Sequence, residues 1–396
     1  MSTQNPVFIP GPTNIPEELR RAIDFPTIDH RSAAFVEMLK PVLEGIKRIL
    51  KTRAGETIIF PATGTGAWEA AVTNTLSPGD RVLAAHHGMF SRRWIDLCQR
   101  QGLDVQVITE AWGKGAPADA FGQALKADPG HRIKAVLVTH NETATGVRSD
   151  VAAVRAAMDA ARHPALLLVD GVSSIASMDF RMDEWGVDIA ITGSQKGFML
   201  PVGLAIVGVS PKALEAMKSA KCPRCFFDFR DMLQTNANGG FPYTPPTSLI
   251  RGMDLSIRML EAEGLDNVFA RHFRIAEGVR RAVDAWGLGL CAKEVALQSD
   301  TISAVVTPVG FDSNRIVTHA AKKYGIAFSV GLGDVAGKVF RIGHLGSMTD
   351  VMALSGIATA EMTMVDLGLD VRLGSGVAAA QEYYRTSLGT QKAQAA

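Results

Sequence analysis

The feature that most constrains the fold is a regular alternation of short apolar runs with helical stretches between residues 57 and 210. Such alternation is typical of α/β proteins, in which mostly parallel strands are joined by helices. It predicts an α/β fold with a mostly parallel seven-stranded sheet flanked by helices. The strand-like runs are Thr57–Phe60, Arg81–Ala85, Val105–Ile108, Ala135–Thr139, Ala165–Asp170, Asp188–Thr192 and Gly203–Ser210, and the helical stretches lie near 66–76, 91–101, 117–127 and 149–162.

The pattern changes after about residue 250, which predicts a second, smaller α+β domain packed against the first. We expect an extended N-terminal arm (1–15), a large domain (16–260), a small C-terminal domain (261–370) and a tail (371–396). The tail is rich in Gly and Ala and is expected to contain a loosely held helix and a frayed end. Further helices are expected from Pro16 and at 32–52, Leu249–Glu263, Asp266–Trp286, 312–324 and 348–366, with small-domain strands near 301–307 and 338–343.

The charge balance excludes some kinds of partner. The 396 residues are 47% hydrophobic and 20% charged, with a formal net charge of +1, so neither nucleic acid nor a membrane surface is favoured as a partner. The sequence shows no signal-peptide pattern and no apolar run of about eighteen residues, so we expect a cytoplasmic protein. Cys222 and Cys225 have C-x-x-C spacing, but no second pair of ligands follows, and we expect no metal site.

Lys196 stands just beyond a strand candidate, because Gly193 and Ser194 end the run Asp188–Thr192 and another run begins at Gly203. Open α/β sheets bind their ligands beyond the carboxyl ends of strands. An amine at that place would be partly desolvated, which favours its neutral, nucleophilic form and permits Schiff-base formation. A solvated loop lysine is the alternative that the local pattern allows.

Two other strand candidates are followed by polar groups. The segment 61–67 follows a strand and opens a helix, so its backbone amides and the Thr65 hydroxyl suit a phosphate monoester. Asp170 ends the most apolar run, where a carboxylate needs a cationic partner; the pyridinium nitrogen of pyridoxal 5′-phosphate would be one. A plain glycine-rich turn and a structural aspartate are the respective alternatives.

Three more side chains fit the same cofactor. Phe90 follows another strand candidate and is placed to stack on the pyridine ring. Thr143 offers a hydroxyl to the phenolic oxygen of the ring, and Arg341, inside a strand candidate, suits bidentate binding of a carboxylate. The alternatives are a packed core aromatic, a capped turn and an intramolecular ion pair.

A series of short motifs occurs in a fixed order along the chain: Pro10-Gly-Pro-Thr-Asn, Asp29-His-Arg-Ser, Gly64-Thr-Gly, His140-Asn-Glu-Thr-Ala-Thr-Gly, Leu168-Val-Asp-Gly-Val-Ser-Ser, Gly193-Ser-Gln-Lys-Gly, Tyr243-Thr-Pro-Pro and Phe340-Arg-Ile-Gly. This series resembles that of the class V, fold-type I pyridoxal-phosphate aminotransferases, in the branch of the alanine–glyoxylate and serine–glyoxylate aminotransferases. The likeness extends from Pro10 to about Leu367. It is strongest to bacterial serine–glyoxylate aminotransferases and to a similar group that uses aspartate as the amino donor.

The resemblance implies a role for each site residue. Lys196 forms the internal aldimine, Asp170 pairs with the pyridine nitrogen, and Arg341, helped by the backbone around Gly11, holds the substrate α-carboxylate. The other cofactor contacts implied are Thr143, Phe90, Gln195, Thr65, Gly66 and Ala67, together with Tyr243 and Thr244, of which Thr244 is expected to reach the phosphate of the neighbouring subunit of a homodimer. The sequence departs from the mammalian alanine–glyoxylate pattern at Phe90, where a tryptophan stacks, at Ala67, where a histidine flanks the phosphate, and at Phe241, where a tyrosine contributes to the partner's phosphate site.

The implied function is a ping-pong transfer of the amino group of L-serine to glyoxylate, which yields hydroxypyruvate and glycine. L-aspartate and alanine are the alternative donors, and a non-catalytic ligand-binding protein of the same fold is the alternative from another class. A cysteine desulfurase is disfavoured, because Gln195 stands where that enzyme has a histidine. Aspartate as donor would require another cation near the cofactor, and the candidates are Arg31, His87 and Arg92.

Overall fold

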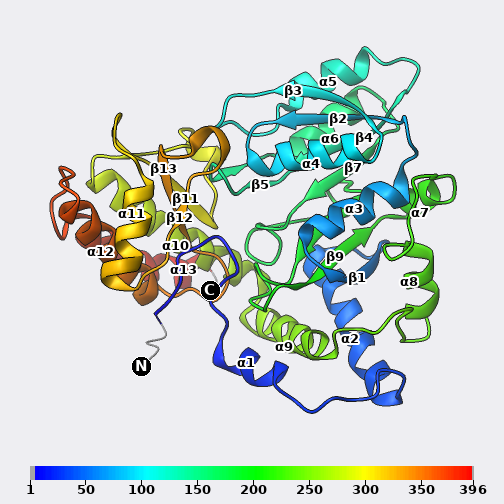
Figure 1. Cartoon of the computed structure of the whole chain (residues 1–396), viewed down its shortest axis with the longest axis horizontal. Helices are drawn as coiled ribbons and strands as arrows, with labels where there is room; N and C mark the ends of the chain where they lie inside the picture. Colours follow the sequence, from blue (N-terminus) through cyan, green and yellow to red (C-terminus); the bar gives the residue numbers. More distant parts are fainter. Residues whose placement is uncertain (1–4, 395–396) are drawn as a thin grey trace.

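The structure, a computed structural model, describes residues 5–394, with side chains described up to residue 387 (Figure 1). Residues 1–4 of the expected arm and the end of the expected tail at 395–396 lie outside the described part. Two bodies lie side by side in Figure 1: a larger one built from the first two thirds of the chain, and a smaller one that contains the C-terminal third.

The larger body is built around a seven-stranded sheet, as the sequence predicts, with the strand order β1-β9-β8-β7-β4-β2-β3. Strand β9 runs antiparallel to its neighbours β1 and β8, and all other pairs are parallel. The carboxyl ends of β1, β8, β7, β4 and β2 therefore lie at the same edge. The strands are β1 (Glu56–Ala62), β2 (Arg81–His86), β3 (Asp104–Thr109), β4 (Ile133–Thr139), β7 (Leu166–Asp170), β8 (Ile189–Gly193) and β9 (Gly203–Val209), and a hairpin of β5 (Asn141–Glu142) and β6 (Val147–Arg148) follows β4.

The central strands are apolar along their whole length because both faces of the sheet are buried. In β7, Leu166 and Leu168 pack into one hydrophobic cluster, whereas Leu167 and Val169 pack into the cluster on the opposite face. The first face is covered by α3 (Gly64–Thr75), α4 (Met89–Arg100), α7 (Pro211–Met217) and α8 (Phe229–Asn236). The other is covered by α2 (Ala33–Leu50), α5 (Ala118–Lys126), α6 (Val151–Ala160) and α9 (Thr247–Glu263), and the short α1 (Glu17–Ile23) lies against α9.

The smaller body is an antiparallel sheet of order β10-β11-β13-β12 that packs against helices. The N-terminal arm joins it: the Phe8 side chain is buried in its core, the Phe8 amide donates to the Ala327 carbonyl at 2.8 Å, and the Phe8 carbonyl accepts from the Gly343 amide at 2.8 Å. The elements are α10 (Leu265–Ala285), β10 (Gly289–Leu290), β11 (Ile302–Val306), α11 (Asn314–His319) with a π-helical turn (Ala320–Tyr324), β12 (Ser329–Val330), β13 (Val339–Gly343), α12 (Asp350–Asp366) and α13 (Ser375–Gln394), with 3-10 turns at Val295–Leu297 and Gly333–Val335.

The expectation of a loosely held helix after Leu369 is wrong. Helix α13 packs against α10, and the side chains of Ala380 and Tyr384 are buried in the core of the smaller body. The Tyr384 hydroxyl donates to the Ile275 carbonyl at 3.0 Å. Gly278 of α10 leaves room for the Tyr384 ring, so the two helices approach closely through small residues that carry little amphipathic signal.

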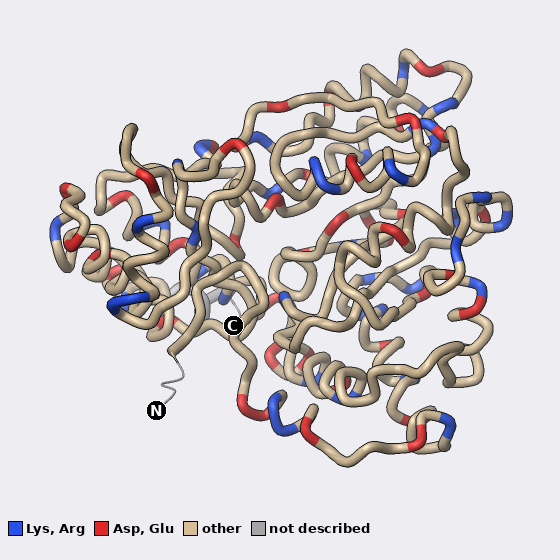
Figure 2. Tube along the Cα trace, viewed as in Figure 1, with Lys and Arg blue, Asp and Glu red and all other residues tan. Residues whose placement is uncertain are grey.

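Figure 2 shows basic and acidic side chains interspersed along the described part of both bodies. The described helices are all too short or too polar to cross a bilayer.

The contact between α10 and α13 yields a prediction about stability. A Cβ atom at position 278 would lie 2.2 Å from Cζ of Tyr384, so Gly278→Ala should overpack the contact and lower the free energy of unfolding by about 1–3 kcal/mol, despite the better helix propensity of alanine. Denaturant unfolding measures this loss. In a Tyr384→Ala background the added methyl group has room, and the same substitution should cost less. An equal cost in both backgrounds would contradict the proposed overpacking.

Candidate active site

The topology brings the predicted site residues to one edge of the large sheet. Strand β7 ends at Asp170, and the adjacent parallel strand β8 ends at Gly193, three positions before Lys196. On the other side of β7, Thr139 at the end of β4 pairs in register with Asp170. Strand β1 points in the same direction and leads into the glycine-containing segment at the start of α3. Segments that are far apart in the sequence therefore meet at these carboxyl ends.

Lys196 lies in the turn between β8 and β9, as predicted, and its side chain is buried. Its Nζ donates to the carbonyl of Pro10. Burial, and to a smaller extent the positive charge of Arg341, lower the pKa of Lys196 to about 8, a shift that the negative charge of Asp170 opposes. At pH 8 about half of the amine is therefore neutral and nucleophilic.

The N-terminal arm lies directly over this lysine. The Thr13 amide donates to the Gln195 carbonyl at 3.2 Å, and the Thr13 hydroxyl donates to the Lys196 carbonyl at 3.3 Å. Gly11 has a φ of 95°, and a Cβ atom there would lie 2.5 Å from Cδ of Lys196. The close approach and the left-handed backbone both require glycine at this position. The contact of Gly11 with a substrate carboxylate stays a prediction.

Asp170 is a buried carboxylate without a cation in direct contact among the described residues. Its Oδ1 accepts the Val172 amide at 2.9 Å. Its pKa is raised to about 7, mainly by burial and also by the negative charge of Glu142, whereas the Val172 amide and the positive charge of Lys196 oppose the shift. Because the ionised form is so poorly compensated, this position favours a positively charged group beside the carboxylate.

The start of α3 forms the expected anion site, but with fewer free amides than predicted. Gly64, Thr65 and Gly66 occupy the first three positions of the helix, and their amides make no backbone hydrogen bond in the described part of the chain. The exposed Thr65 side chain stands beside them. The Ala67 amide donates to the Thr63 carbonyl at 3.1 Å, so the prediction that this amide is a free donor is wrong. Three amides and one hydroxyl at a helix N-terminus remain available to a phosphate.

Arg341 connects the small domain to the site. It lies in β13 and is buried; its Nε donates to the Val330 carbonyl at 2.8 Å, and its Nη1 donates to the Thr143 carbonyl at 2.9 Å. Burial lowers the pKa of Arg341 to about 10, an effect that the negative charge of Glu142 opposes. The guanidinium stays charged at neutral pH, and its Nη2 makes no hydrogen bond to a described residue.

The Thr143 hydroxyl is shared with Ser173, whose Oγ lies 2.7 Å away. Ser173 also donates to the Asn141 carbonyl at 3.0 Å. If Ser173 uses its proton there, Thr143 must donate to Ser173 and has no proton left for the cofactor. Thr143 becomes a donor to a ring oxygen only when Ser173 turns its proton toward Thr143. Ser173 is thus a partner of the site that the sequence interpretation missed, although its motif was recognised.

Phe90 lies in the first turn of α4, partly buried, and its amide donates to both oxygens of Glu142 at 3.1 Å. Glu142 was also missed, although it lies inside the motif that ends at Gly146. His87 is buried, and burial lowers the pKa of its imidazole, which disfavours the charged form; its role as a cation for a dicarboxylic donor stays a prediction. Arg31 and Arg92 are exposed.

The structure describes the surroundings of three more predicted cofactor residues, Tyr243, Thr244 and Gln195. Tyr243 donates its hydroxyl to the Cys225 carbonyl at 2.8 Å and stacks on Phe226 with 4.8 Å between ring centroids. Thr244, the next residue, is exposed. Gln195 keeps a buried Oε1 without a hydrogen-bond partner in the described part. The roles of these three residues in phosphate binding stay predictions.

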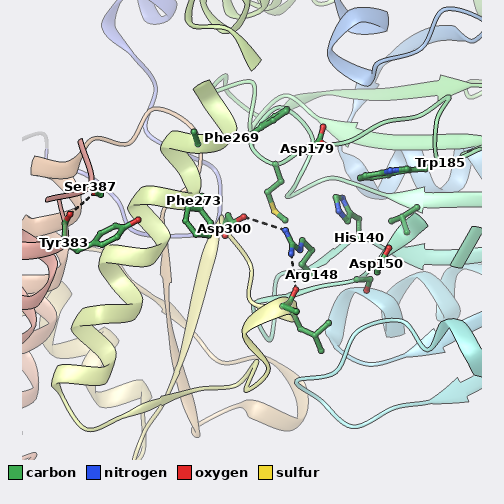
Figure 3. A pocket seen from close by; sticks show the side chains of 16 residues that line it. His140, Arg148, Asp150, Asp179, Trp185, Phe269, Phe273, Asp300, Tyr383 and Ser387 are labelled. Atoms are coloured by element: carbon green, nitrogen blue, oxygen red, sulfur yellow. Dashed lines mark hydrogen bonds and ion pairs between the residues drawn. The ribbon is translucent and has the colours of Figure 1, made fainter. Parts of the chain in front are cut away.

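A separate crevice of about 800 Å³ lies between the two bodies (Figure 3). Arg148 points across it toward Asp300, and its Nη2 donates to the Ala296 carbonyl at 3.0 Å. His140 lies at its wall, where burial lowers the pKa of the imidazole to about 4. The residues that line the crevice do not include Lys196, Asp170 or Arg341, so the candidate chemistry lies elsewhere.

The cysteines and the other possible ligands do not form a metal centre in the described residues. Cys222 is buried and Cys225 is exposed, and both are free thiols. No group of three or more His, Cys, Asp or Glu side chains in this part of the chain is arranged to hold a metal ion.

A nucleophilic amine beside an uncompensated buried carboxylate is the pairing that pyridoxal phosphate requires, because that cofactor carries both an aldehyde and a basic ring nitrogen. The large α/β domain and the small α+β domain that frame this pair define the class: the protein is a fold-type I pyridoxal-phosphate-dependent enzyme.

Comparison with known proteins narrows the class. The family model described as aminotransferase class-V matches residues 23–344. The chain is 67% identical to the L-aspartate–glyoxylate aminotransferase of Paracoccus denitrificans, over all of both chains, and 56% identical to the serine–glyoxylate aminotransferase of Hyphomicrobium methylovorum, over 96% of this chain and 94% of the relative. The crystal structure of pyridoxamine–pyruvate aminotransferase from Mesorhizobium loti superposes with a TM-score of 0.90 at 28% identity, covering 97% of this chain and 98% of that one. The chain belongs to the class V aminotransferases.

The residues present fit pyridoxal phosphate. Asp170 has a place for a cation, the first turn of α3 has three free amides, and Lys196 has a nucleophilic amine. These groups match the ring nitrogen, the phosphate and the aldehyde in turn, so each of these three groups of the cofactor has a candidate partner in this chain.

The raised pKa of Asp170 predicts a pH-dependent stability of the apoenzyme. The native state binds a proton at Asp170 up to pH of about 7, whereas the unfolded state releases it near pH 4, so this group loses its stabilising contribution as the pH rises between these values. Asp170→Asn should therefore gain about 1–4 kcal/mol relative to wild type between pH 4.5 and 7.5 in denaturant unfolding of the apoenzyme. The exposed Asp370→Asn is the control and should show no such gain. A constant difference between wild type and Asp170→Asn would contradict the raised pKa.

Proposed function

We propose that the protein is a glyoxylate aminotransferase that moves the amino group of a small L-amino acid to glyoxylate by a ping-pong mechanism. The pairing of the buried Lys196 amine with Asp170 is the observation that carries the aminotransferase chemistry. Glyoxylate as acceptor is supported by the two relatives described above, whose names share this acceptor but differ in the donor.

Bound pyridoxal phosphate supplies an aldehyde that joins to amines and a ring that draws electrons from the substrate Cα. Lys196 accepts the Cα proton on its Nζ, which its lowered pKa suits to this task near pH 8. Asp170 holds a proton on the ring nitrogen by placing a negative charge beside it. The arm residues Pro10 and Gly11 limit the access of water to the amine from one side.

Arg341 binds the α-carboxylate of both substrates. Its Nε and Nη1 are fixed by carbonyls, so the guanidinium is held in one orientation and its Nη2 edge is available to the ligand. The Thr143 carbonyl that fixes it belongs to the same turn as the Thr143 hydroxyl. Substrate and cofactor are therefore oriented by one turn of the large domain.

The proposal includes a homodimer with shared active sites. Thr244 is exposed, so its hydroxyl is accessible to another subunit, and the resemblance implies that it reaches the cofactor phosphate of the neighbouring subunit. We also propose the division into a large domain (16–260) and a small domain (261–370), and a cytoplasmic location.

The proposal also concerns which amino acid is the preferred amino donor. The full-length identity of 67% to the aspartate enzyme, against 56% to the serine enzyme, favours L-aspartate as the preferred donor. L-serine, the donor expected from the sequence, is retained as the second candidate. A second carboxylate on the donor requires another cation, and the candidates are Arg31, Arg92 and His87, of which His87 is disfavoured because burial lowers its pKa.

The donor preference is measured with glyoxylate as the common acceptor. We expect kcat/KM for L-aspartate to exceed that for L-serine and L-alanine by about tenfold or more, which corresponds to about 1.4 kcal/mol of transition-state binding. The reverse ratio would establish serine as the donor and overturn this part of the proposal. An absence of turnover with glyoxylate and every donor would reject the proposed function itself.

Replacement of the nucleophile gives an independent test. Lys196→Ala should bind pyridoxal phosphate without the visible absorbance band of the covalently held cofactor, and should lose at least about a thousandfold in kcat, because both the covalent link and the proton acceptor are removed. The matched control is Lys218→Ala, an exposed lysine of the same domain, which should leave both properties unchanged. Full activity of Lys196→Ala would show that another group is the nucleophile.

A further inference from the structure

Glu142 is a completely buried carboxylate at the end of β5. It accepts the Phe90 amide on both oxygens at 3.1 Å, the Ser91 amide at 2.9 Å and the Ala144 amide at 3.2 Å. Amide donors at the N-terminus of a helix are suitable partners for a buried negative charge. The carboxylate thus joins the first turn of α4 to the turn that follows β4, two segments more than 50 positions apart in the sequence.

Each segment joined in this way carries a group of the candidate site. The α4 segment carries Phe90, the aromatic ring expected to lie on the cofactor. The other carries Thr143, whose carbonyl holds Nη1 of Arg341 and whose hydroxyl is shared with Ser173. Glu142 therefore stands between the surface for the cofactor ring and the anchor for the substrate carboxylate, without being required to touch either ligand.

The glycine at position 88 is explained by the close approach of the Glu142 carboxylate. A Cβ atom at Gly88 would lie 2.2 Å from Cγ and 2.3 Å from Cδ of Glu142. The φ angle of Gly88 is 177°, an extended conformation that any residue adopts, so backbone strain does not explain this glycine. The missing side chain instead provides the space that the carboxylate occupies.

We propose that Glu142 is a positioning residue of the active site, which fixes Phe90 against the cofactor and fixes the Thr143 turn that orients Arg341. This inference rests on the proposed function, because it takes the cofactor ring to lie beside Phe90 and the substrate carboxylate beside Arg341. This role differs from general stabilisation of the fold. Substitution of a positioning residue should weaken the binding of cofactor and substrate, whereas substitution of a purely structural residue should lower stability alone.

The test uses Glu142→Gln, which keeps the shape of the side chain but removes its charge and turns an NH₂ group toward backbone N–H donors. The affinity of the apoenzyme for pyridoxal 5′-phosphate, measured by fluorescence titration, should fall by about tenfold or more, as expected for the loss of charge-assisted hydrogen bonds. In the cofactor-saturated enzyme, KM for glyoxylate should rise by a larger factor than kcat falls, because Arg341 is less well oriented.

Glu361 provides a matched control. It is another buried glutamate, in α12, and it accepts the indole N–H of Trp286 at 3.0 Å and the Gly374 amide at 3.0 Å, within the core of the small domain. Glu361→Gln should lower the thermal stability about as much as Glu142→Gln, but should leave cofactor affinity and KM unchanged. The comparison separates a positioning role from a structural one.

A second variant, Gly88→Ala, displaces the carboxylate but keeps its charge, and it should weaken cofactor binding by a similar factor. The proposal is overturned if Glu142→Gln binds cofactor and glyoxylate as wild type does, or if Gly88→Ala binds cofactor normally while Glu142→Gln does not, since the charge alone would then matter. Failure of the wild-type apoenzyme to bind pyridoxal 5′-phosphate would count against the proposed function instead, so the two failures are distinguishable.

Discussion

The withdrawal of the Lys196 amine from water is the constraint on which the rest of the site depends. A buried ammonium is unfavourable unless it has an acceptor or gives up its proton, and the protein offers both solutions. The Pro10 carbonyl accepts from Nζ, and burial together with Arg341 favours the neutral form. This arrangement needs the arm to cross directly over the lysine, which in turn requires glycine at position 11. A flexible arm that left the turn open would return the lysine to solvent and to its ordinary pKa.

The site is also complete only when the two bodies are packed together. Arg341 belongs to the small domain, but the Thr143 carbonyl that orients it belongs to the large one. Nearby, the Asn141 side chain donates to the Thr301 hydroxyl at 2.8 Å, and Thr301 donates to the Ser173 carbonyl at 3.0 Å. These buried polar contacts cross the same boundary close to the Thr143–Ser173 pair. The position of Arg341, the proposed substrate anchor, is therefore coupled to the Thr143 and Ser173 hydroxyls.

The parts of the fold that were predictable share a local signal. Strands buried on both faces give unbroken apolar runs, and a polar residue directly after such a run, as at Asp170, marks the functional edge of the sheet. Helix α13 gave no such signal, because it packs through small residues and through Tyr384, whose partner Gly278 lies more than 100 positions away. Glu142 was missed for a similar reason: its amide partners come mainly from α4, and no spacing in the sequence relates the two segments.

The two ionisable groups at the centre of the site, Lys196 and Asp170, show how burial shifts the pKa of an amine and of a carboxyl in opposite directions. Burial disfavours charge on both side chains, so it lowers the pKa of the Lys196 amine and raises the pKa of the Asp170 carboxyl. The pKa values of about 8 for Lys196 and about 7 for Asp170 therefore both lie near neutral pH, far from the ordinary values of the two groups. A cationic ring nitrogen beside Asp170 would restore the charge of that carboxylate, and the same positive charge would further disfavour protonation of any amine close to it. In the proposed function, binding of the cofactor would therefore separate the two roles: it would keep Asp170 ionised and leave Lys196 as the group that exchanges protons.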